Sequence, residues 1–142
     1  MAEAPVFVDT GYLVALLNRR DDLHGRARKL AESFAKEDRH LLTTDAILVE
    51  LGNFFARSAL RALAVASIQR LRNAPGWTIE HITPQRLTRA IARYAAHPDK
   101  HWSLTDCASM DVMLEHRATE VATPDHHFAQ AGFHVLMRSP SP

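Results

Sequence analysis

The sequence has little that would mark a secreted, membrane-spanning or strongly charged protein. Its single cysteine, Cys107, allows no internal disulfide bond, which fits a reducing cytoplasm. No apolar run approaches the roughly 18–20 residues of a membrane span, and the N-terminal "MAEAPVFV" lacks the basic and apolar regions of a secretory signal. The net charge of +1 is too small to indicate nucleic-acid binding by itself. We therefore expect a cytoplasmic protein with no membrane partner.

What the chain does contain is typical of a globular protein. Its 142 residues are 46% hydrophobic and 23% charged, which is enough to build a hydrophobic core. We see no internal repeat, low-complexity tract or linker in the sequence. We therefore expect one domain over residues 1–142, in which only the tail Ser139–Pro142 is disordered.

Short β-branched runs alternate with amphipathic segments along the chain. The runs predict strands at 5–8, 40–43, 77–82, 120–123 and 134–137. The segments between them predict helices at 11–18, 22–37, 45–57, 58–73, 84–96, from 103 onwards and at 125–131. Strands that are separated by helices pair in parallel, with helices on both faces of the sheet. The sequence therefore predicts an α/β fold with a central parallel sheet of about five strands.

Two aspartates directly follow predicted buried strands. Asp9 ends "VFVD", and Asp125 follows "VATP". Right-handed crossovers place the carboxyl ends of parallel strands on one edge of the sheet, where sites of such folds lie. Each aspartate can instead simply cap the next helix, as can Asp106, three residues after the helix start at Ser103. Their common edge favours a shared site over three separate caps.

Glu50 is a fourth acidic residue, and a capping role does not account for it. It lies about five residues into its predicted helix, beside the apolar stripe of Ile47, Leu51 and Phe54. A carboxylate at such a position is costly unless it is paired or bound to a metal ion. The alternative is that Glu50 turns outward or pairs with an arginine such as Arg57.

Four acidic side chains at one edge of a sheet require a cation. Carboxylates about 4 Å apart repel by about 4 kcal/mol per pair at an effective dielectric constant of about 20. A set of oxygen ligands favours Mg²⁺ or Mn²⁺ over zinc. Such a centre suits the hydrolysis of phosphodiester bonds, because the metal activates water and stabilises the leaving oxygen. Thr10 and Thr123, beside the outer acids, can hold a metal-bound water or serve as ordinary cap residues.

Four segments of the sequence resemble the PIN-domain ribonucleases and, within them, the VapC-type toxins of bacterial toxin–antitoxin pairs. They are "VFVDTGYLVALLN", "LLTTDAILVELGNFF", "WSLTDCASMDVMLEH" and "EVATPDHHFAQAGFHVL", in family order over nearly the whole chain. The resemblance implies a PIN-like three-layer sandwich and a Mg²⁺- or Mn²⁺-dependent endoribonuclease. It implies a homodimer, an RNA substrate, and a cognate antitoxin whose tail can fill the acidic groove.

The resemblance also implies roles for individual residues. Its catalytic metal ligands match Asp9, Glu50, Asp106 and Asp125, and its hydroxyl residues match Thr10 and Thr123. The family's occasional extra acid is Ser109 here, which argues against a fifth ligand. Asp111 is a poor replacement because it lies about 140° around the helix from Asp106.

Two other functions stay open at this point. A catalytically inactive PIN-like module that binds RNA or protein is one, although all four acids are present. The stretch "VFVDT" also suits a phosphatase with an aspartyl nucleophile, of the haloacid-dehalogenase-like kind. Those enzymes place a second aspartate two residues after the first, where this chain has Gly11, so this interpretation is weak.

Several further groups of residues lack a role in the predicted centre. His126 and His127 predict a solvated turn, with contact to a substrate phosphate as the alternative, and no zinc-binding pattern includes them. A stripe of Arg86, Arg89 and Arg93 predicts a solvated helix face, with RNA contact as the alternative.

Apolar residues supply two more predictions. Cys107, Met110 and Leu114 are expected to lie in the core. The runs "AILVELGNFF" and "SALRALAVASIQRLRN" carry more hydrophobic surface than a small domain requires, so part of it is expected to form a dimer or antitoxin interface.

Overall fold

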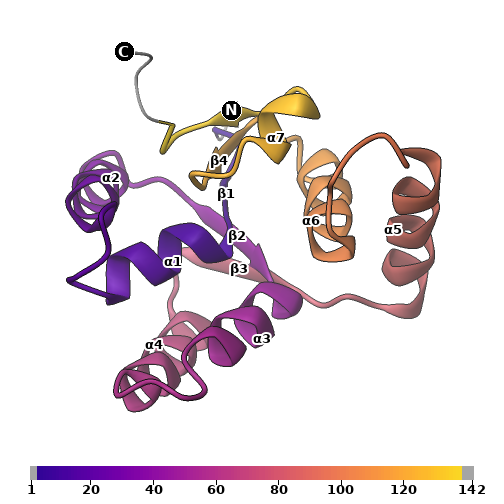
Figure 1. Cartoon of the computed structure of the whole chain (residues 1–142). Coiled ribbons are helices and arrows are strands. Elements are labelled where there is room, and N and C mark those ends of the chain that lie inside the picture. The colour runs from indigo at the N-terminus through magenta and orange to yellow at the C-terminus, as the bar shows by residue number, and fades with distance from the viewer. Residues whose placement is uncertain (1–2, 139–142) are drawn as a thin grey trace.

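The chain, described by a computed structural model over residues 3–138, contains a five-stranded parallel sheet (Figure 1). The strands are β1 (Val6–Val8), β2 (Leu41–Thr44), β3 (Trp77–Glu80), β4 (Glu120–Ala122) and β5 (His134–Val135). Their order is β3-β2-β1-β4-β5, and every neighbouring pair runs parallel. The predicted parallel sheet is confirmed. The tail that the sequence predicts to be disordered, 139–142, lies outside the described residues.

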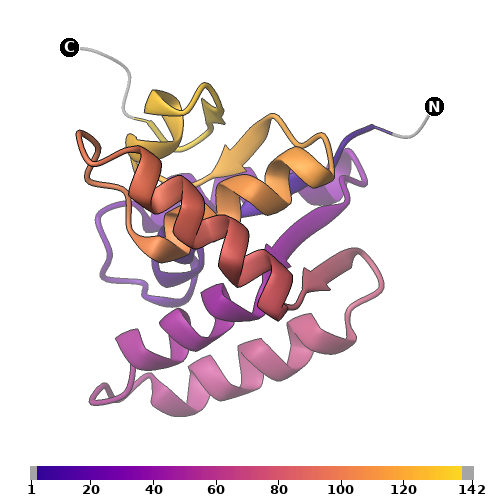
Figure 2. The same ribbon diagram turned by 90° about the vertical axis from the view of Figure 1, so that its right-hand side faces the viewer.

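Helices connect the strands and cover both faces of the sheet. They are α1 (Thr10–Leu17), α2 (His24–Lys36), α3 (Asp45–Phe54), α4 (Arg61–Asn73), α5 (Pro84–Ala96), α6 (Leu104–Glu115) and α7 (His127–Gln130). Figure 1 shows α1 and α2 on one side of the sheet and α5 and α6 on the other. Helices α3 and α4 run together as a pair (Figure 2). This arrangement confirms the predicted three-layer α/β fold. No helix within residues 3–138 is long and apolar enough to cross a membrane.

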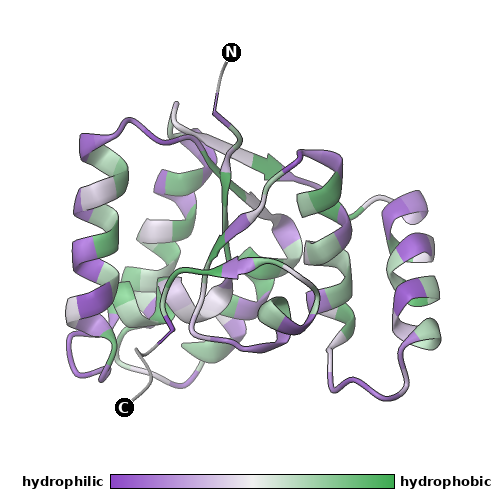
Figure 3. Cartoon of the chain, turned by 90° about the horizontal axis from the view of Figure 1, so that it is seen from above, coloured by the Kyte–Doolittle hydropathy of each residue, from purple (hydrophilic) through white to green (hydrophobic). Residues whose placement is uncertain are grey.

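The centre of the core is the central strand β1. Val6, Phe7 and Val8 are fully buried, because β1 has the neighbours β2 and β4 on its two sides and helices on both faces. Its register aligns Phe7 with Leu42 of β2 and Val121 of β4. Hydrophobic residues follow the strands and the inner faces of the helices, and hydrophilic residues lie outside (Figure 3). Burial of this strand fixes the position at which Asp9 leaves the sheet.

Three helices that precede strands end in the same kind of turn. Asp38, Arg117 and Gly132 follow α2, α6 and α7 with φ angles of 51°, 56° and 94°. Each such left-handed residue is followed by a backbone N–H that donates back to the helix, as in Ala118 N to Met113 O at 2.9 Å. These are Schellman-type ends, which satisfy the last carbonyl groups of the helix. They turn the chain sharply into β2, β4 and β5.

The end of α3 differs from the prediction. The helix ends at Phe54 rather than at residue 57, and Phe54 is 61% exposed, whereas Phe55 is 2% exposed. The prediction that Phe54 shares the buried stripe was therefore wrong. The stripe follows Ile47, Leu51 and Phe55 at intervals of four residues, so only the second of the two phenylalanines faces the core. Helix α4 accordingly begins at Arg61 and not at residue 58.

Other boundaries shift by at most two residues. Strands β3 and β5 end at Glu80 and Val135, before the predicted positions 82 and 137, and α7 begins at His127 rather than at Asp125. Cys107 and Met110 are fully buried as predicted, but Leu114 is 56% exposed, so its assignment to the core was wrong.

Only part of the arginine stripe on α5 is a solvated face, because the Arg89 side chain is 57% exposed whereas those of Arg86 and Arg93 are 16% and 25% exposed. Its three side chains form an arginine–carboxylate network, defined here as Arg86, Arg89 and Arg93 with Glu80, Asp111 and Glu115. Arg86 contacts Glu80 and Glu115, each at 2.8 Å, and its side chain is only 16% exposed. Packing of α5 on α6 brings these charges together, which the stripe by itself does not predict.

Candidate active site

The predicted acidic residues come from four elements of the fold. Asp9 directly follows β1, and Asp125 follows β4 after two residues. Glu50 lies on α3, and Asp106 lies in the first turn of α6. We call these four residues the acid cluster, because electrostatic coupling joins Asp9 to Glu50 and Asp106, and Asp106 to Asp125, beyond the carboxyl ends of β1 and β4.

Asp9 is the most enclosed member of the acid cluster, with 6% of its surface exposed. Its Oδ2 accepts a hydrogen bond of 2.8 Å from Oγ1 of Thr123, which directly follows β4. Asp9 occupies the N-cap position of α1, yet its side chain makes no capping hydrogen bond. The simple capping interpretation is therefore wrong for Asp9, whose carboxylate is directed toward β4.

Glu50 lies next to Asp9. Its Oε1 accepts a hydrogen bond from Oγ1 of Thr10, the residue that follows Asp9. Glu50 also lines a cavity of about 420 Å³ together with Asp45, Asn53 and others. The structure therefore does not pair Glu50 with Arg57, and a hydroxyl group holds its carboxylate beside the end of β1.

Asp106 and Asp125 form the other half of the acid cluster. The Oδ2 atom of Asp106 accepts a hydrogen bond from Ser103 N at 3.0 Å, and Ser103 Oγ accepts one from Asp106 N, so the predicted capping box is present. Oδ1 of Asp125 accepts a hydrogen bond of 2.9 Å from His127 N. A capping role and membership of the acid cluster are thus compatible for Asp106, whereas Asp125 precedes His126, the N-cap residue of α7.

His127 joins these two carboxylates, a role that the preferred interpretation of the sequence missed. Its Nδ1 lies 3.2 Å from Asp106 Oδ2 and 3.2 Å from Asp125 Oδ1. Its neighbour His126 is 65% exposed in its side chain and lies 3.8 Å from Asp125, in keeping with a solvated turn. The prediction of a turn was therefore wrong for His127. The two adjacent histidines offered no periodicity that would distinguish the inward one.

Gly11 allows the two halves of the site to approach each other. A Cβ atom on Gly11 would lie 2.7 Å from Cδ of Pro124, which is closer than side chains tolerate. A larger residue would push the start of α1 away from the segment that carries Asp125. Sequence reasoning considered Gly11 only as a missing acid. The sequence does offer a signal for this close approach, namely Gly11 two residues after Asp9 and Pro124 directly before Asp125.

Burial and neighbouring charges raise the pKa of Asp9 and of Asp106. Burial raises the pKa of Asp9 to about 7, hydrogen bonds from Thr123 and Thr10 oppose this, and the charges of Asp106 and Glu50 add to it. Burial also raises the pKa of Asp106, the hydrogen bond from Ser103 opposes this, and the charge of Asp125 adds to it. These couplings run through all four members of the acid cluster.

The residue types of the acid cluster are those that bind divalent cations in proteins. Within residues 3–138, no lysine or arginine forms an ion pair with Asp9, Glu50, Asp106 or Asp125. The donors are carboxylate oxygens, which Mg²⁺ and Mn²⁺ prefer. Asp111 is held by Arg93 at 2.8 Å, in agreement with its exclusion as a ligand. Among the described residues, the ligand atoms of Asp125, His126 and His127 lie within 4.8 Å of one another, close enough to hold a metal ion, whereas no three members of the acid cluster come this close together.

A model of the PIN domain matches residues 6–134 of the chain. The chain belongs to the PIN-domain family. This confirms the resemblance seen in the sequence. Among PIN-domain proteins, the chain is 28% identical over 128 residues to the 23S rRNA-specific endonuclease VapC20 of Mycobacterium tuberculosis, strains H37Rv and CDC 1551. The match covers 90% of this chain and 95% of the relative.

Solved PIN-domain structures agree with this assignment. The crystal structure of Mycobacterium tuberculosis VapC20, described as a sarcin-ricin loop cleaving toxin, superposes with a TM-score of 0.80 at 27% identity. It covers 90% of this chain and 95% of that one. The structure of FitAcB from Neisseria gonorrhoeae has a TM-score of 0.65 at 20% identity and covers 92% and 95% of the two chains. At that identity the second likeness shows the fold alone.

Proposed function

We propose that this PIN-domain chain is a Mg²⁺- or Mn²⁺-dependent endoribonuclease and the toxin of a type II toxin–antitoxin pair. The observation that supports the proposal is the acid cluster, in which four carboxylates are coupled electrostatically without a lysine or arginine partner among the described residues. Like charges so placed require a cation. The similarity to VapC20 over 90% of the chain supports the RNA-cleaving activity.

The proposed ligands are Asp9, Glu50, Asp106 and Asp125. These residues would hold a Mg²⁺ or Mn²⁺ ion, which would supply a water of lowered pKa and would stabilise the charge that develops on the leaving oxygen. Thr123 orients Asp9 through their 2.8 Å hydrogen bond, and Thr10 orients Glu50 in the same way. The two hydroxyl residues therefore act as positioning residues behind the carboxylates.

His127 completes the proposed site from the side of α7. Its imidazole contacts Asp106 and Asp125 in the same geometry, at 3.2 Å from each. A ring held in this way fixes the orientation of two carboxylates that come from different elements. We assign His127 the role of positioning these acids relative to each other.

The partners follow from the same proposal. VapC20 is a toxin that acts on the sarcin-ricin loop of 23S rRNA, so this loop is the first RNA to test.

A cognate antitoxin and a homodimer are proposed because large apolar side chains stay exposed on α3 and α4. Val49 and Phe54 are 63% and 61% exposed, and Leu63 and Val65 are 43% and 50% exposed. Sedimentation at high concentration tests the homodimer, and a strictly monomeric species would contradict it.

The activity itself is tested with RNA and with small phosphate esters in parallel. We expect the purified chain to cleave an RNA that contains the sarcin-ricin loop with Mg²⁺ or Mn²⁺, and to stop when EDTA is added. Small phosphate esters should not be hydrolysed, because Gly11 occupies the position of the phosphatase acid. Binding of RNA without metal-dependent turnover would instead identify an inactive binding module and contradict the proposal.

A further inference from the structure

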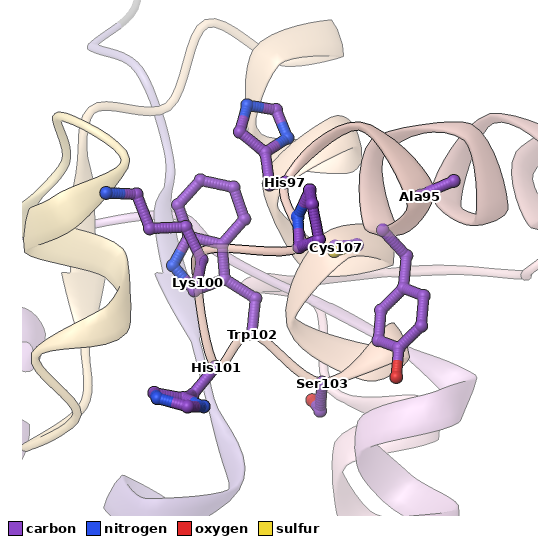
Figure 4. A pocket seen from close by; sticks show the side chains of 9 residues that line it. Ala95, His97, Lys100, His101, Trp102, Ser103 and Cys107 are labelled. Carbon is purple, nitrogen blue, oxygen red and sulfur yellow. The ribbon is translucent and has the colours of Figure 1, made fainter.

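A second cavity, of about 700 Å³, opens beside the acid cluster at the loop that joins α5 to α6. Lys100, His101 and Trp102 of this loop line one side of it, and Ser103 lies at its lower rim in Figure 4. Tyr94 and His97, from the end of α5, complete the wall. This volume lies within the range of roughly 300–1,000 Å³ that is typical of small-molecule sites.

The lining of this cavity has the opposite electrostatic character to the acid cluster. Of the described residues that line it, none carries a carboxylate, and it contains a lysine, two histidines and two aromatic rings. Lys100 pairs with Asp99 at 3.4 Å, but the Asp99 side chain is 69% exposed, so water screens this pair. Tyr94 is 54% exposed and presents its ring to solvent. Cationic and aromatic groups together are the usual elements of single-stranded nucleic-acid sites.

The wall of the cavity is held in place by defined contacts. The ring of His97 packs on the ring of Trp102, with centroids 4.8 Å apart, and its Nδ1 lies 2.9 Å from Arg93 O. The indole N–H of Trp102 donates to Oε1 of Gln130 on α7 at 3.2 Å. Trp102 itself is only 7% exposed. It supports the wall, and the exposed ring of Tyr94 is available to a ligand.

The cavity and the acid cluster share structural elements. Ser103 lines the cavity, and its N–H and hydroxyl group hold Asp106 at 3.0 Å. Helix α7, to which Trp102 is bonded through Gln130, begins with His127 of the site. A ligand bound in the cavity therefore lies next to the acid cluster and on the same scaffold.

We infer that this cavity binds one nucleotide of the RNA, adjacent to the bond that is cleaved. The base stacks on Tyr94, and Lys100 contacts the neighbouring phosphate. The inference rests on the proposed function for its substrate and adds a subsite that selects the base at one position. Stacking on an aromatic side chain is strong and sequence-tolerant, so selectivity for the base comes from the imidazole groups of His97 and His101.

A binding experiment without metal tests this subsite separately from catalysis. Fluorescence anisotropy in EDTA would compare short single-stranded oligoribonucleotides of A, C, G and U. We expect Tyr94→Ala and Lys100→Ala each to weaken binding of the preferred oligonucleotide about tenfold. Tyr94→Phe keeps the aromatic ring and should stay within about twofold of the parent protein. Lys29→Ala is the matched control, because Lys29 is an exposed lysine on α2, across the sheet from the cavity (Figure 1).

Three results of this experiment would overturn the subsite. These are unchanged affinity in Tyr94→Ala and Lys100→Ala, an equal loss in Lys29→Ala and Lys100→Ala, and stronger competition by an acidic peptide than by unlabelled RNA. Circular dichroism would verify that the variants are folded, which the exposure of Tyr94 favours.

Cleavage kinetics distinguish failure of the subsite from failure of the nuclease. We expect Tyr94→Ala to raise KM about tenfold with kcat within about twofold, and to relax the base preference at one position beside the cut. Metal-dependent cleavage with an unchanged KM and an unchanged cut-site preference would overturn the subsite and leave the nuclease intact. Loss of oligonucleotide binding in the two variants, in a chain that never cleaves RNA, would support the subsite and refute the nuclease.

Discussion

The acid cluster and the arginine–carboxylate network place similar charges in opposite surroundings. In the network, a hydrogen bond from Arg86 lowers the pKa of Glu115, and bonds from Arg86 and His116 outweigh burial to lower the pKa of Glu80. In the acid cluster, burial and like charges raise the pKa of Asp9 to about 7 and also raise that of Asp106. Among residues 3–138, arginine side chains pair with the carboxylates of the network, whereas no lysine or arginine pairs with the acid cluster. The unpaired group is therefore the one that requires an external cation.

The largest expected effect is on the rate of RNA cleavage, when one carboxylate is removed from the acid cluster and, for comparison, one from the network. Asp9→Asn should lower the rate of RNA cleavage at least about a thousandfold, because it removes a central ligand of the proposed metal centre. Glu115→Gln, on the same helix as Asp106 but at its other end, should keep the rate within about threefold. Single-turnover cleavage in Mn²⁺ measures both. Full activity in Asp9→Asn would contradict the claim that the acid cluster, and not the network, is required for cleavage.

Substitutions in the network should lower the stability of the protein, whereas substitutions in the acid cluster should lower its activity. Arg86→Met removes two ion pairs from a side chain that is 16% exposed and leaves Glu80 and Glu115 without Arg86 as their partner. We expect a loss of about 2 kcal/mol in the free energy of unfolding, or roughly 4–8 °C in Tm.

The matched control for this change is Arg89→Met. Its side chain is 57% exposed and makes a single ion pair with Glu115, so its loss should cost at most about 0.5 kcal/mol. Thermal unfolding followed by circular dichroism measures both variants. Equal Tm values for Arg86→Met and the parent protein would show that the network does not stabilise the fold.

A smaller effect is expected from the hydroxyl group that holds Glu50. Thr10→Val keeps the shape of the side chain but removes its hydrogen bond to Glu50. Because the carboxylate itself remains, we expect cleavage to fall about tenfold rather than a thousandfold. Thr10→Ser, which restores the hydroxyl group, should recover most of the rate. If Thr10→Ser were as slow as Thr10→Val, the role of Thr10 would be packing and not positioning.

The smallest effect is a pH dependence of the metal-free protein. Because the folded pKa of Asp9 lies above its unfolded value, the folded state binds the proton more tightly. Stability in EDTA should therefore fall as pH rises from about 4 to about 7, with no further contribution from Asp9 above that.

Asp9→Asn provides the comparison for this pH dependence. It should flatten the decline and raise Tm at pH 8 by a few °C, since no buried charge forms. Adding Mg²⁺ at pH 8 should raise Tm of the parent protein and not of the variant. An Asp9→Asn variant less stable than the parent in EDTA would mean that the Asp9 charge is already compensated within the protein.

Local patterns in the sequence predict much of the fold and the residues of the acid cluster. Asp9 and Asp125 follow apolar runs that could only be short strands, and parallel pairing places both at one edge. Glu50 stood out because it interrupts an apolar helix without a capping role. Each of these inferences needs only residues that are neighbours in the chain, together with general rules for parallel sheets.

The features that the sequence did not reveal depend on contacts between distant segments. The arginine stripe meets its carboxylates only when α5 packs on α6 and beside the end of β3. His127 is directed into the site by its own backbone bond to Asp125, whereas His126, with the same chemistry, stays in solvent. Burial of Phe55 rather than Phe54 likewise depends on the space that the other core residues leave.

The most direct test is the position of Mn²⁺ in crystals of the protein, found by its anomalous X-ray scattering. We expect a peak bound by Asp9 and at least two of Glu50, Asp106 and Asp125, and no peak at the arginine–carboxylate network. Absence of a peak at the acid cluster, or a peak held only by Asp125, His126 and His127, would contradict the account.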